Sequence, residues 1–307
     1  SLRAYMEAIE HHGNVITIKE IDQDNYELAG LMYKLVDKHG WLGAPAVVVE
    51  KIKIDGRWME GPIIVNQYGL ASHEAIAVGV PFEEISNYDQ IANFKRALKL
   101  VTDLGEIQPI KPVQVERHQA PAKEIILNGQ DINVLDFPFL QSNPGDNGRF
   151  INTGNLVLID PEKGRNVGTY RMQIKGPRKI GINPERKQHG WEFLMGMKER
   201  GEKVAQAAVV LGTDPIVFAM SSSKTARLGQ DELEIAGGFK GRPVEVVKCE
   251  NSDNTVPAHV EMIIEGEIPL DDMEAEGPFG EMYGYMGLPH AEQFYMNIKT
   301  ITHRKNP

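Results

Sequence analysis

A series of short β-type segments in the second half of the chain constrains the fold more than any other feature. Apolar and β-branched runs alternate there with turns rich in Gly, Pro, Asp and Asn. One helix is expected within the series, from about His189 to Glu202. Many short strands with few helices are typical of a β-barrel or a β-sandwich. The predicted strands are Gly154–Ile159, Gly168–Ile174, Ala207–Leu211, Ile216–Ala219, Val244–Val247, Val260–Glu265 and Asn297–Ile301.

The first hundred or so residues show a different pattern, in which helical and strand periods alternate. This pattern predicts an α/β lobe, with Gly40 as the C-cap of its second helix. No catalytic cluster is visible in it, and solvated or capping roles account for His11, His12, His39 and His73. The predicted elements are helices over Leu2–His11, Leu28–Val36, His73–Val80 and Tyr88–Leu100, and strands over Val15–Lys19 and Ala46–Glu50.

A chain of 307 residues exceeds the usual size of one domain, so two lobes are expected. We predict an N-terminal α/β domain over residues 1–106 and a proline-rich linker with entry strands over 107–141. A β-rich domain is predicted over 142–307. The fold class is therefore α+β.

Composition narrows the classes of partner. The net charge of −10 disfavours nucleic acid and anionic membranes, which require clustered Lys and Arg. No apolar run reaches the length of a membrane span, and a cytoplasmic location is expected. The single cysteine, Cys249, excludes a disulfide framework within the chain and is expected to be a buried structural thiol.

The segment from Glu276 to Gly284 carries the strongest chemical signal. It reads Glu-Gly-Pro-Phe-Gly-Glu-Met-Tyr-Gly, so Glu276 and Glu281 flank a tight turn. Two carboxylates held close in one pocket titrate differently, as a proton-transfer site requires. A turn with two surface glutamates explains the segment equally well.

Four further elements of the β-rich lobe could carry chemistry. Alternation along a strand would place Asn166, Gly168 and Tyr170 on one face and Thr169 and Arg171 on the other. Each element also has a structural explanation, such as a turn or a helix cap. The four elements are Asn166–Arg171, Lys187–Trp191, the polar loop Ser221–Lys224 and Asp231–Gly237.

Taken in order, these elements resemble the UbiD family of (de)carboxylases, which use prenylated FMN. The resemblance is dense from about Gly154 to Arg304 and looser before that. It implies a split β-barrel that binds the flavin. The matching stretches are Asn166–Arg171, His189, Leu211–Pro215, Glu232–Gly237, Pro243–Cys249, Asn254–Ala258 and Glu276–Glu281.

The resemblance also implies how the cofactor is held. Asn166, His189 and Glu232 match the family's divalent-metal ligands, usually for Mn²⁺, which tie the cofactor phosphate to the protein. The loop Ser221–Ser223 lies where the family places K⁺, although its sequence departs from the family pattern. The implied cofactor-binding residues are Asn166, Gly168, Thr169, Tyr170, Arg171, Gln188, His189, Ser221, Ser222 and Ser223.

Arg171, Glu276 and Glu281 match the family's catalytic Glu-Arg-Glu network. The implied reaction is reversible, non-oxidative decarboxylation of an aromatic or α,β-unsaturated acid. The substrate carboxylate lies near Arg171, a covalent substrate–cofactor adduct forms, and Glu281 protonates the product carbon.

The resemblance leaves two alternatives open. Family members are longer, and the C-terminal domain that mediates their assembly has no counterpart in the sequence. We therefore expect either a decarboxylase that is a homo-oligomer in full-length form or a non-catalytic fragment. A split-barrel flavin protein with redox activity is the second alternative, and it would not need the Glu-Arg-Glu network. The other expected partners are the carboxylic acid substrate and a flavin prenyltransferase that supplies the cofactor.

Overall fold

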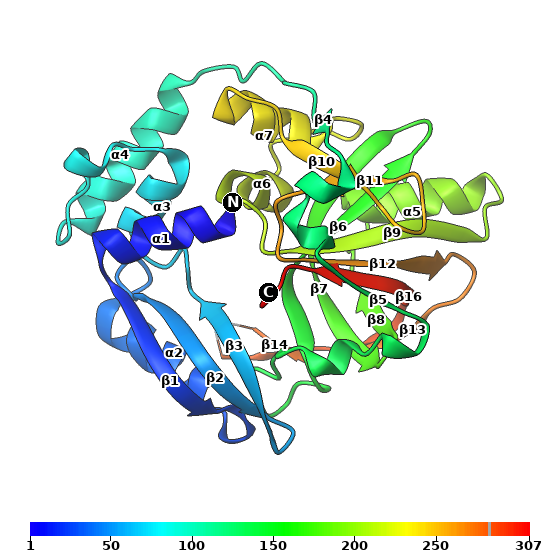
Figure 1. The fold of residues 1–307 in the computed structure, drawn as a ribbon, viewed down its shortest axis with the longest axis horizontal. Coiled ribbons are helices and arrows are strands. Elements are labelled where there is room, and N and C mark those ends of the chain that lie inside the picture. The colour runs from blue at the N-terminus through cyan, green and yellow to red at the C-terminus, as the bar shows by residue number, and fades with distance from the viewer. Residues whose placement is uncertain (282–283) are drawn as a thin grey trace. The chain divides into compact units, whose positions relative to one another are not determined.

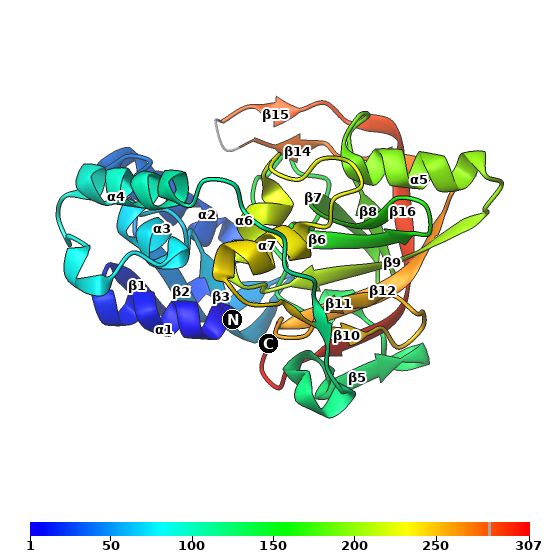
Figure 2. The ribbon, with the colours of Figure 1, turned by 90° about the horizontal axis from the view of Figure 1, so that it is seen from above.

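The computed structural model describes residues 1–281 and 284–307. The chain forms two compact units, Ser1–Ile107 and Gln108–Lys305, and each is described separately below. Figures 1 and 2 show the two units in two perpendicular views.

The first unit is a small mixed sheet with four helices. β1 and β2 pair in parallel, and β3 adds to β2 in antiparallel register. Residues of α1 such as Tyr5 and Ile9 pack with Ala46 of β2, and α4 contributes Ala97 to a second cluster with Ala75 and Val80. The elements are α1 (Leu2–His12), β1 (Val15–Asp22), α2 (Glu27–His39), β2 (Ala46–Ile54), β3 (Arg57–Val65), α3 (Ala71–Val78) and α4 (Gln90–Asp103).

The predicted elements of this unit are present, and Gly40 caps α2 by donating its N–H to Val36 O. The sequence analysis missed β3, whose Gly61 and Pro62 interrupt the strand pattern. The interpretation of His73 as solvated or capping is wrong, because its side chain is fully buried in α3. Burial lowers the pKa of His73 to about 4, with a smaller contribution in the same direction from His12.

The second unit is built around a closed antiparallel barrel (Figures 1 and 2). Its strands follow the order β12-β9-β6-β7-β8-β16, and pairing of β12 with β16 closes the ring. β5 and β13 extend the sheet along β16. The strands are β6 (Phe150–Asp160), β7 (Gly164–Gly176), β8 (Lys179–Ile182), β9 (Val204–Leu211), β12 (Met262–Pro269), β13 (Glu274–Glu276), β16 (His290–His303) and β5 (Ile125–Asn128).

The barrel residues form the largest hydrophobic core of the chain. Leu156, Met172 and Ile264 from three different strands are fully buried in it, and Phe193 of helix α5 (His189–Glu199) packs among them. Burial of such side chains contributes about 1.5–3 kcal/mol each. The predicted α+β class with a split barrel is confirmed by this topology.

Two further helices and three short pairings complete the second unit. Ile216–Ala219, predicted as a strand, lies in helix α6 (Pro215–Ser222), so that prediction is wrong. Asp214 caps this helix by accepting from the N–H of Ile216, and Pro215 occupies its first position, which is a strong helix-start signal. The remaining elements are α7 (Glu232–Lys240), β4 (Val113–Gln114), β10 (Glu245–Lys248), β11 (Thr255–Pro257), β14 (Phe279–Gly280) and β15 (Met286–Gly287).

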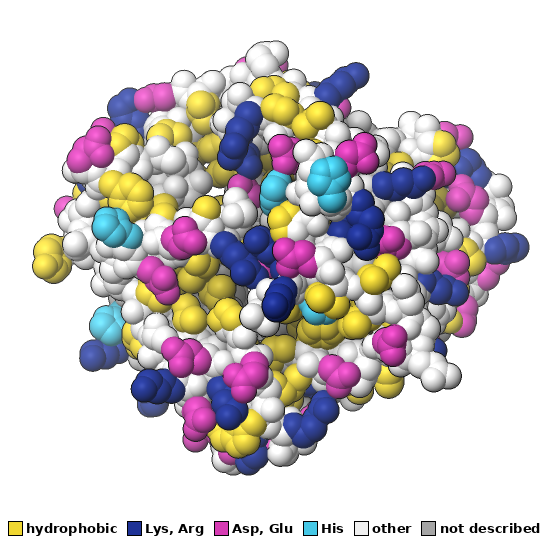
Figure 3. Space-filling model, in the orientation of Figure 1, with side chains coloured by type: hydrophobic (Ala, Val, Ile, Leu, Met, Phe, Trp, Pro, Cys, Tyr) yellow, Lys and Arg dark blue, Asp and Glu magenta, His cyan; other side chains and the backbone are white. Residues whose placement is uncertain are grey.

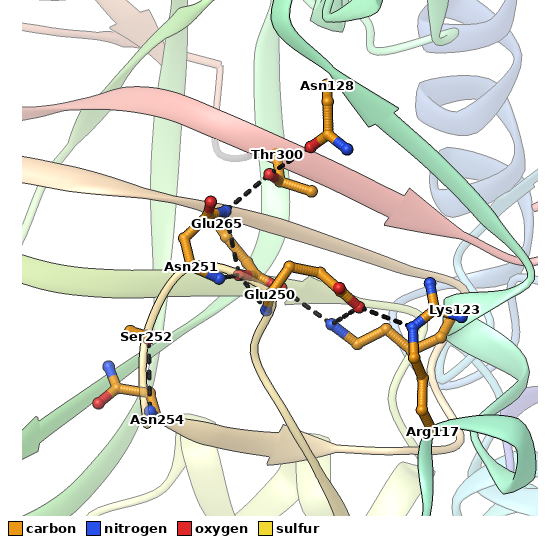
Figure 4. A network of polar contacts seen from close by, with 9 residues as sticks. All are labelled: Arg117, Lys123, Asn128, Glu250, Asn251, Ser252, Asn254, Glu265 and Thr300. Carbon is orange, nitrogen blue, oxygen red and sulfur yellow. Dashed lines mark hydrogen bonds and ion pairs between the residues drawn. The ribbon is translucent and has the colours of Figure 1, made fainter.

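A buried charge network joins the entry segment to the barrel (Figure 4). Lys123 Nζ lies 2.9 Å from Glu265 Oε1 and 3.3 Å from Glu250 Oε1. The other oxygen of Glu265 accepts from the backbone N–H groups of Glu250 and Asn251. Because both buried charges are fully hydrogen-bonded, removing one partner would leave the other uncompensated.

Two properties of the chain relate to its composition, namely the distribution of charges on the surface and the burial of the single cysteine. Acidic and basic side chains are mixed over the face shown in Figure 3. Cys249 is buried, and burial raises the pKa of its thiol to about 12, as expected for a structural residue. No helix in the described ranges is both long and apolar enough to cross a bilayer.

Candidate active site

Arg171 and Glu276 form the centre of the first cluster. Arg171 projects from β7, and its Nε and Nη2 donate to the two carboxylate oxygens of Glu276 at 3.1 and 3.0 Å. Glu276 ends β13 and is completely buried. A fork-to-fork pair of this kind fixes the plane of the guanidinium as well as its position.

Glu281 lies at the open side of the same guanidinium. Its Oε1 is 3.7 Å from Nη1 of Arg171, and its side chain is 37% exposed. The Phe279 ring stacks beneath the guanidinium, with 5.0 Å between Cζ and the ring centroid. The structure thus brings Arg171, Glu276 and Glu281 together, with one carboxylate buried and the other accessible. Met282 and Tyr283, which continue the segment, lie outside the described residues.

The loop that carries the two carboxylates is held by hydrogen bonds from outside it. Buried Asp146 accepts from Gly280 N–H at 2.6 Å, and buried Gln173 accepts from Gly277 N–H at 3.1 Å. The Asn147 N–H donates to Pro278 O at 3.0 Å. These contacts make the segment a fixed frame and exclude the alternative of a turn with two surface glutamates.

A second cluster forms where β7, α5 and α7 meet. Glu232, the first residue of α7, accepts from Asn166 Nδ2 at 3.1 Å and from the Val167 N–H at 2.7 Å. His189, the first residue of α5, places Nδ1 at 3.7 Å from Glu232 Oε1. Asn166 Oδ1 is buried without a hydrogen-bond partner in the described part of the chain. The structure therefore brings Asn166, His189 and Glu232 together from three elements.

The electrostatics of this cluster favour a cation. Burial raises the pKa of Glu232 to about 7, although the hydrogen bond from Val167 opposes the shift. An amide oxygen, an imidazole and a carboxylate are ligands that a divalent cation of intermediate hardness accepts. No group of three His, Cys, Asp or Glu converges within residues 1–281 and 284–307. The cluster of Asn166, His189 and Glu232 has only two members of these types, because its third member is an amide.

Tyr170 ties α5 to β7 between these two clusters. Its buried hydroxyl accepts from Gly190 N–H at 3.0 Å. A Cβ on Gly168 or Gly190 would lie within 2.6–2.7 Å of Tyr170 atoms, so both positions need glycine. Tyr170 therefore acts here as packing between strand and helix. The predicted alternation of β7 is present, since Tyr170 is buried while Thr169 and Arg171 are partly exposed.

Hydroxyl groups gather on the other face of β7. Thr169 Oγ1 lies 3.0 Å from Ser221 Oγ and 2.8 Å from Ser222 Oγ. Asn155 Nδ2 donates to both Thr169 and Ser221. Ser221 and Ser222 belong to the end of α6 and only Ser223 follows it, so the prediction of a loop after a strand is wrong here.

Two of the predicted cofactor-binding residues, Gln188 and Ser223, take no part in the contacts described above. Gln188 occupies the N-cap position of α5, and its side chain accepts from Glu185 N–H at 2.8 Å. Ser223 Oγ donates to Met220 O and Thr225 Oγ1. The sequence analysis missed Asn155, Asp146 and Gln173, because buried amides and acids that hold a site from other strands have no local sequence signal.

Comparison with known proteins decides the family. Residues 113–307 match the model of the UbiD family, described as the 3-octaprenyl-4-hydroxybenzoate carboxy-lyase Rift-related domain. The chain belongs to the UbiD family. The predicted family is therefore confirmed, and the two clusters above lie within the matched residues.

Similar proteins extend the match to the N-terminal unit. The phenolic acid decarboxylase of Sedimentibacter hydroxybenzoicus is 31% identical over 100% of this chain and 62% of its own length. The solved vanillic acid decarboxylase ShVdcCD of that organism, in closed form, has a TM-score of 0.86 at 29% identity and 62% coverage of its chain. An evolved dimeric form of the UbiD-class enzyme HmfF from Pelotomaculum thermopropionicum, in complex with prFMN, has a TM-score of 0.82 at 31% identity, covering all of this chain and 66% of that one.

This UbiD-family chain spans about three fifths of the length of the curated relatives it matches. The similarity therefore covers both units and both clusters, and the two named proteins of Sedimentibacter hydroxybenzoicus are decarboxylases.

Proposed function

We propose that this UbiD-family protein decarboxylates an aromatic or α,β-unsaturated carboxylic acid, reversibly and without oxidation, with prenylated FMN as cofactor. The proposal rests on the arrangement around Arg171. Buried Glu276 accepts two hydrogen bonds from one edge of its guanidinium, and accessible Glu281 lies 3.7 Å from the other edge. The three residues are proposed as the catalytic group. A redox flavin protein has no need for such an acid–base arrangement.

The second cluster supports the cofactor part of the proposal. Asn166, His189 and Glu232 would hold a divalent cation, Mn²⁺ in our proposal, and buried Asn166 Oδ1 is the orphaned acceptor that such an ion would satisfy. Asn166 and Arg171 lie five residues apart on β7, about 16 Å along an extended strand. This separation suits a ligand with a phosphate at one end and a reactive ring at the other.

The hydroxyl groups beside β7 complete the proposed cofactor site. We propose Gly168, Thr169, Tyr170, Gln188 and Ser221–Ser223 as further binding residues, with K⁺ near the serines. Thr169 Oγ1 lies 3.0 Å from Ser221 Oγ and 2.8 Å from Ser222 Oγ, and oxygen ligands are those that hard cations prefer.

The residues of the chain define the steps that it can perform. Arg171 orients the substrate carboxylate through its Nη1 edge, which faces Glu281. Glu276, which is buried and accepts two hydrogen bonds from Arg171, keeps the guanidinium in place. Glu281 delivers the proton to the carbon that loses carbon dioxide. When bound, prenylated FMN would accept the electron pair that stays on the substrate carbon as its bond to carbon dioxide breaks.

The test is co-expression with a flavin prenyltransferase, followed by mass spectrometry of released small molecules, metal analysis and a decarboxylation screen. We expect prenylated FMN, manganese and release of carbon dioxide from an unsaturated acid. Plain flavin with a redox activity, or protein that binds neither cofactor nor metal, would contradict the proposal. Size-exclusion chromatography with light scattering of the full-length protein tests the proposed homo-oligomer.

A further inference from the structure

We infer that Asn183 is a positioning residue for Arg171 and that Gln293 fixes Asn183 in turn. Asn183 directly follows β8, and Gln293 lies on β16, the strand that pairs with β8. Both side chains are buried, with 7% and 3% of their surfaces exposed. The catalytic consequence of the inference rests on the proposed function, whereas its geometric part does not.

The contact between Asn183 and Arg171 is specific. The side-chain amide of Asn183, with its oxygen toward the guanidinium, accepts from Nε at 2.9 Å and from Nη2 at 3.1 Å. A guanidinium carries only donors, so the oxygen is the atom that Asn183 must present to it. Nε and Nη2 also bond Glu276, and each is therefore shared between a charged and a neutral acceptor.

The orientations of the Asn183 and Gln293 amides are coupled. Gln293 Nε2 would otherwise donate to Asn183 Oδ1, while Gln293 Oε1 accepts from the Phe294 N–H at 3.3 Å. The amide groups of Asn183 and Gln293 lie 2.6 Å apart. With the Asn183 oxygen turned to Arg171, its nitrogen donates to Gln293, which must then present its own oxygen. Because neither amide reaches solvent, a wrong orientation of either would leave a buried donor facing a donor.

The result is a guanidinium with one fully occupied edge. Glu276 and Asn183 take the Nε and Nη2 edge, and Phe279 supports the face. Only the Nη1 side, toward Glu281, remains for a substrate carboxylate. Asn183 occupies this edge with a neutral amide. A third carboxylate in its place would weaken the attraction of Arg171 for a substrate anion.

The experiment measures solvent exchange of the Arg171 Nε proton by ¹H–¹⁵N NMR, with the signal assigned through its loss in Arg171→Lys. We compare the wild type with Asn183→Ala, Asn183→Asp and Gln293→Leu. Asn254→Ala is the matched control, since Asn254 also donates a side-chain hydrogen bond, to Gln206 O at 3.1 Å, away from Arg171. Asn183→Ser takes the place of Asn183→Ala if the alanine variant does not fold.

We expect Asn183→Ala to accelerate the exchange about tenfold, as the loss of one hydrogen bond implies, and Gln293→Leu to do so more weakly. The catalytic constant kcat should fall about 10²-fold in Asn183→Ala, the scale of a misplaced catalytic group. Asn183→Asp keeps an acceptor and should retain slow exchange, but KM for the acid should rise about tenfold because the added carboxylate repels the substrate anion.

Exchange in Asn183→Ala (or Asn183→Ser) equal to that in the wild type and the control would overturn the inference. The inference would also be overturned if Asn183→Asp had an unchanged KM together with fast exchange of the Arg171 Nε proton. A wild-type protein with no decarboxylase activity would instead contradict the proposed function, while the exchange measurement would still decide the role of Asn183.

Discussion

At the scale of single residues, the site separates two tasks between two carboxylates. Glu276 is buried and accepts from Arg171 with both of its oxygens, whereas partly exposed Glu281 has one oxygen near Nη1 of Arg171. A carboxylate committed to a buried ion pair is a poor proton donor, because protonation would leave Arg171 uncompensated. We therefore propose Glu281, and not Glu276, for the proton transfer.

Glu281→Gln should reduce turnover by about 10²–10⁴-fold, the usual contribution of a general acid, because the amide cannot deliver a proton. Cofactor content should be unchanged. Steady-state kinetics and flavin quantification check both parts. Glu274→Gln, which removes a partly exposed carboxylate from the same strand as Glu276, is the control and should retain activity. Full activity in Glu281→Gln would remove Glu281 from the acid role.

His189→Ala should lose both manganese and cofactor, because we propose its imidazole as one of the three metal ligands, beside Glu232. Metal analysis and mass spectrometry of released flavin measure the loss. His259→Ala removes a half-exposed histidine paired with Glu245 and should leave both contents unchanged. A fully loaded His189→Ala protein would contradict the metal assignment.

At the scale of elements, β7 organises the site. Asn166 and Arg171 come from this one strand, and Tyr170 between them anchors the start of α5, where His189 lies. The spacing of the two clusters therefore depends on the strand, and the placement of His189 depends on how closely α5 approaches it.

Gly190→Ala should lower the free energy of unfolding by about 1–3 kcal/mol, because the new methyl group would overlap the Tyr170 hydroxyl, 2.7 Å from the ideal Cβ position. Chemical denaturation measures the effect. In a Tyr170→Phe background, Gly190→Ala should lower the free energy of unfolding by less, because the hydroxyl oxygen closest to the new methyl group is absent. Gly168→Ala, which meets ring carbons as well, should not be relieved in that background. Equal costs of Gly190→Ala in both backgrounds would refute this packing argument.

At the scale of the whole molecule, the two units carry different buried polar groups. Buried His73 belongs to the first, whereas the Lys123–Glu265 pair joins the entry segment to the barrel of the second. The domains over 1–106 and 142–307 with the linker 107–141 remain our proposal, and each of the two compact units should respond to pH through its own groups.

The first unit should become less stable as pH falls from about 6.5 to about 4. In this window His73 binds a proton in the unfolded state but not in the folded state, whose pKa is about 4. The free energy of unfolding should fall by up to about 3 kcal/mol, and the decrease should level off below the folded-state pKa of His73. Hydrogen exchange of amides within residues 1–107 measures it.

His73→Gln should flatten this pH dependence, and His39→Gln, which replaces an exposed histidine of the same unit, should leave it unchanged. An equally steep dependence in His73→Gln would show that other groups cause the loss of stability.

The sequence by itself determined what local signals encode. Strand and helix periods predicted the α/β lobe and the β-rich lobe, and the ordered stretches around Asn166, Glu232 and Glu276 indicated the family. Where two local signals conflicted, as at Ile216–Ala219, the Asp-Pro helix start prevailed over the apolar, β-branched run.

Only the tertiary structure decided which distant residues meet. Pairing of β8 with β16 brings Gln293 next to Asn183, and the folded chain also places Asp146 next to the loop of Glu276. Such contacts join residues separated by more than a hundred positions, and a buried amide looks like any other amide in a sequence. Their physical basis is the requirement that every buried polar group find a partner, which only the folded chain can satisfy.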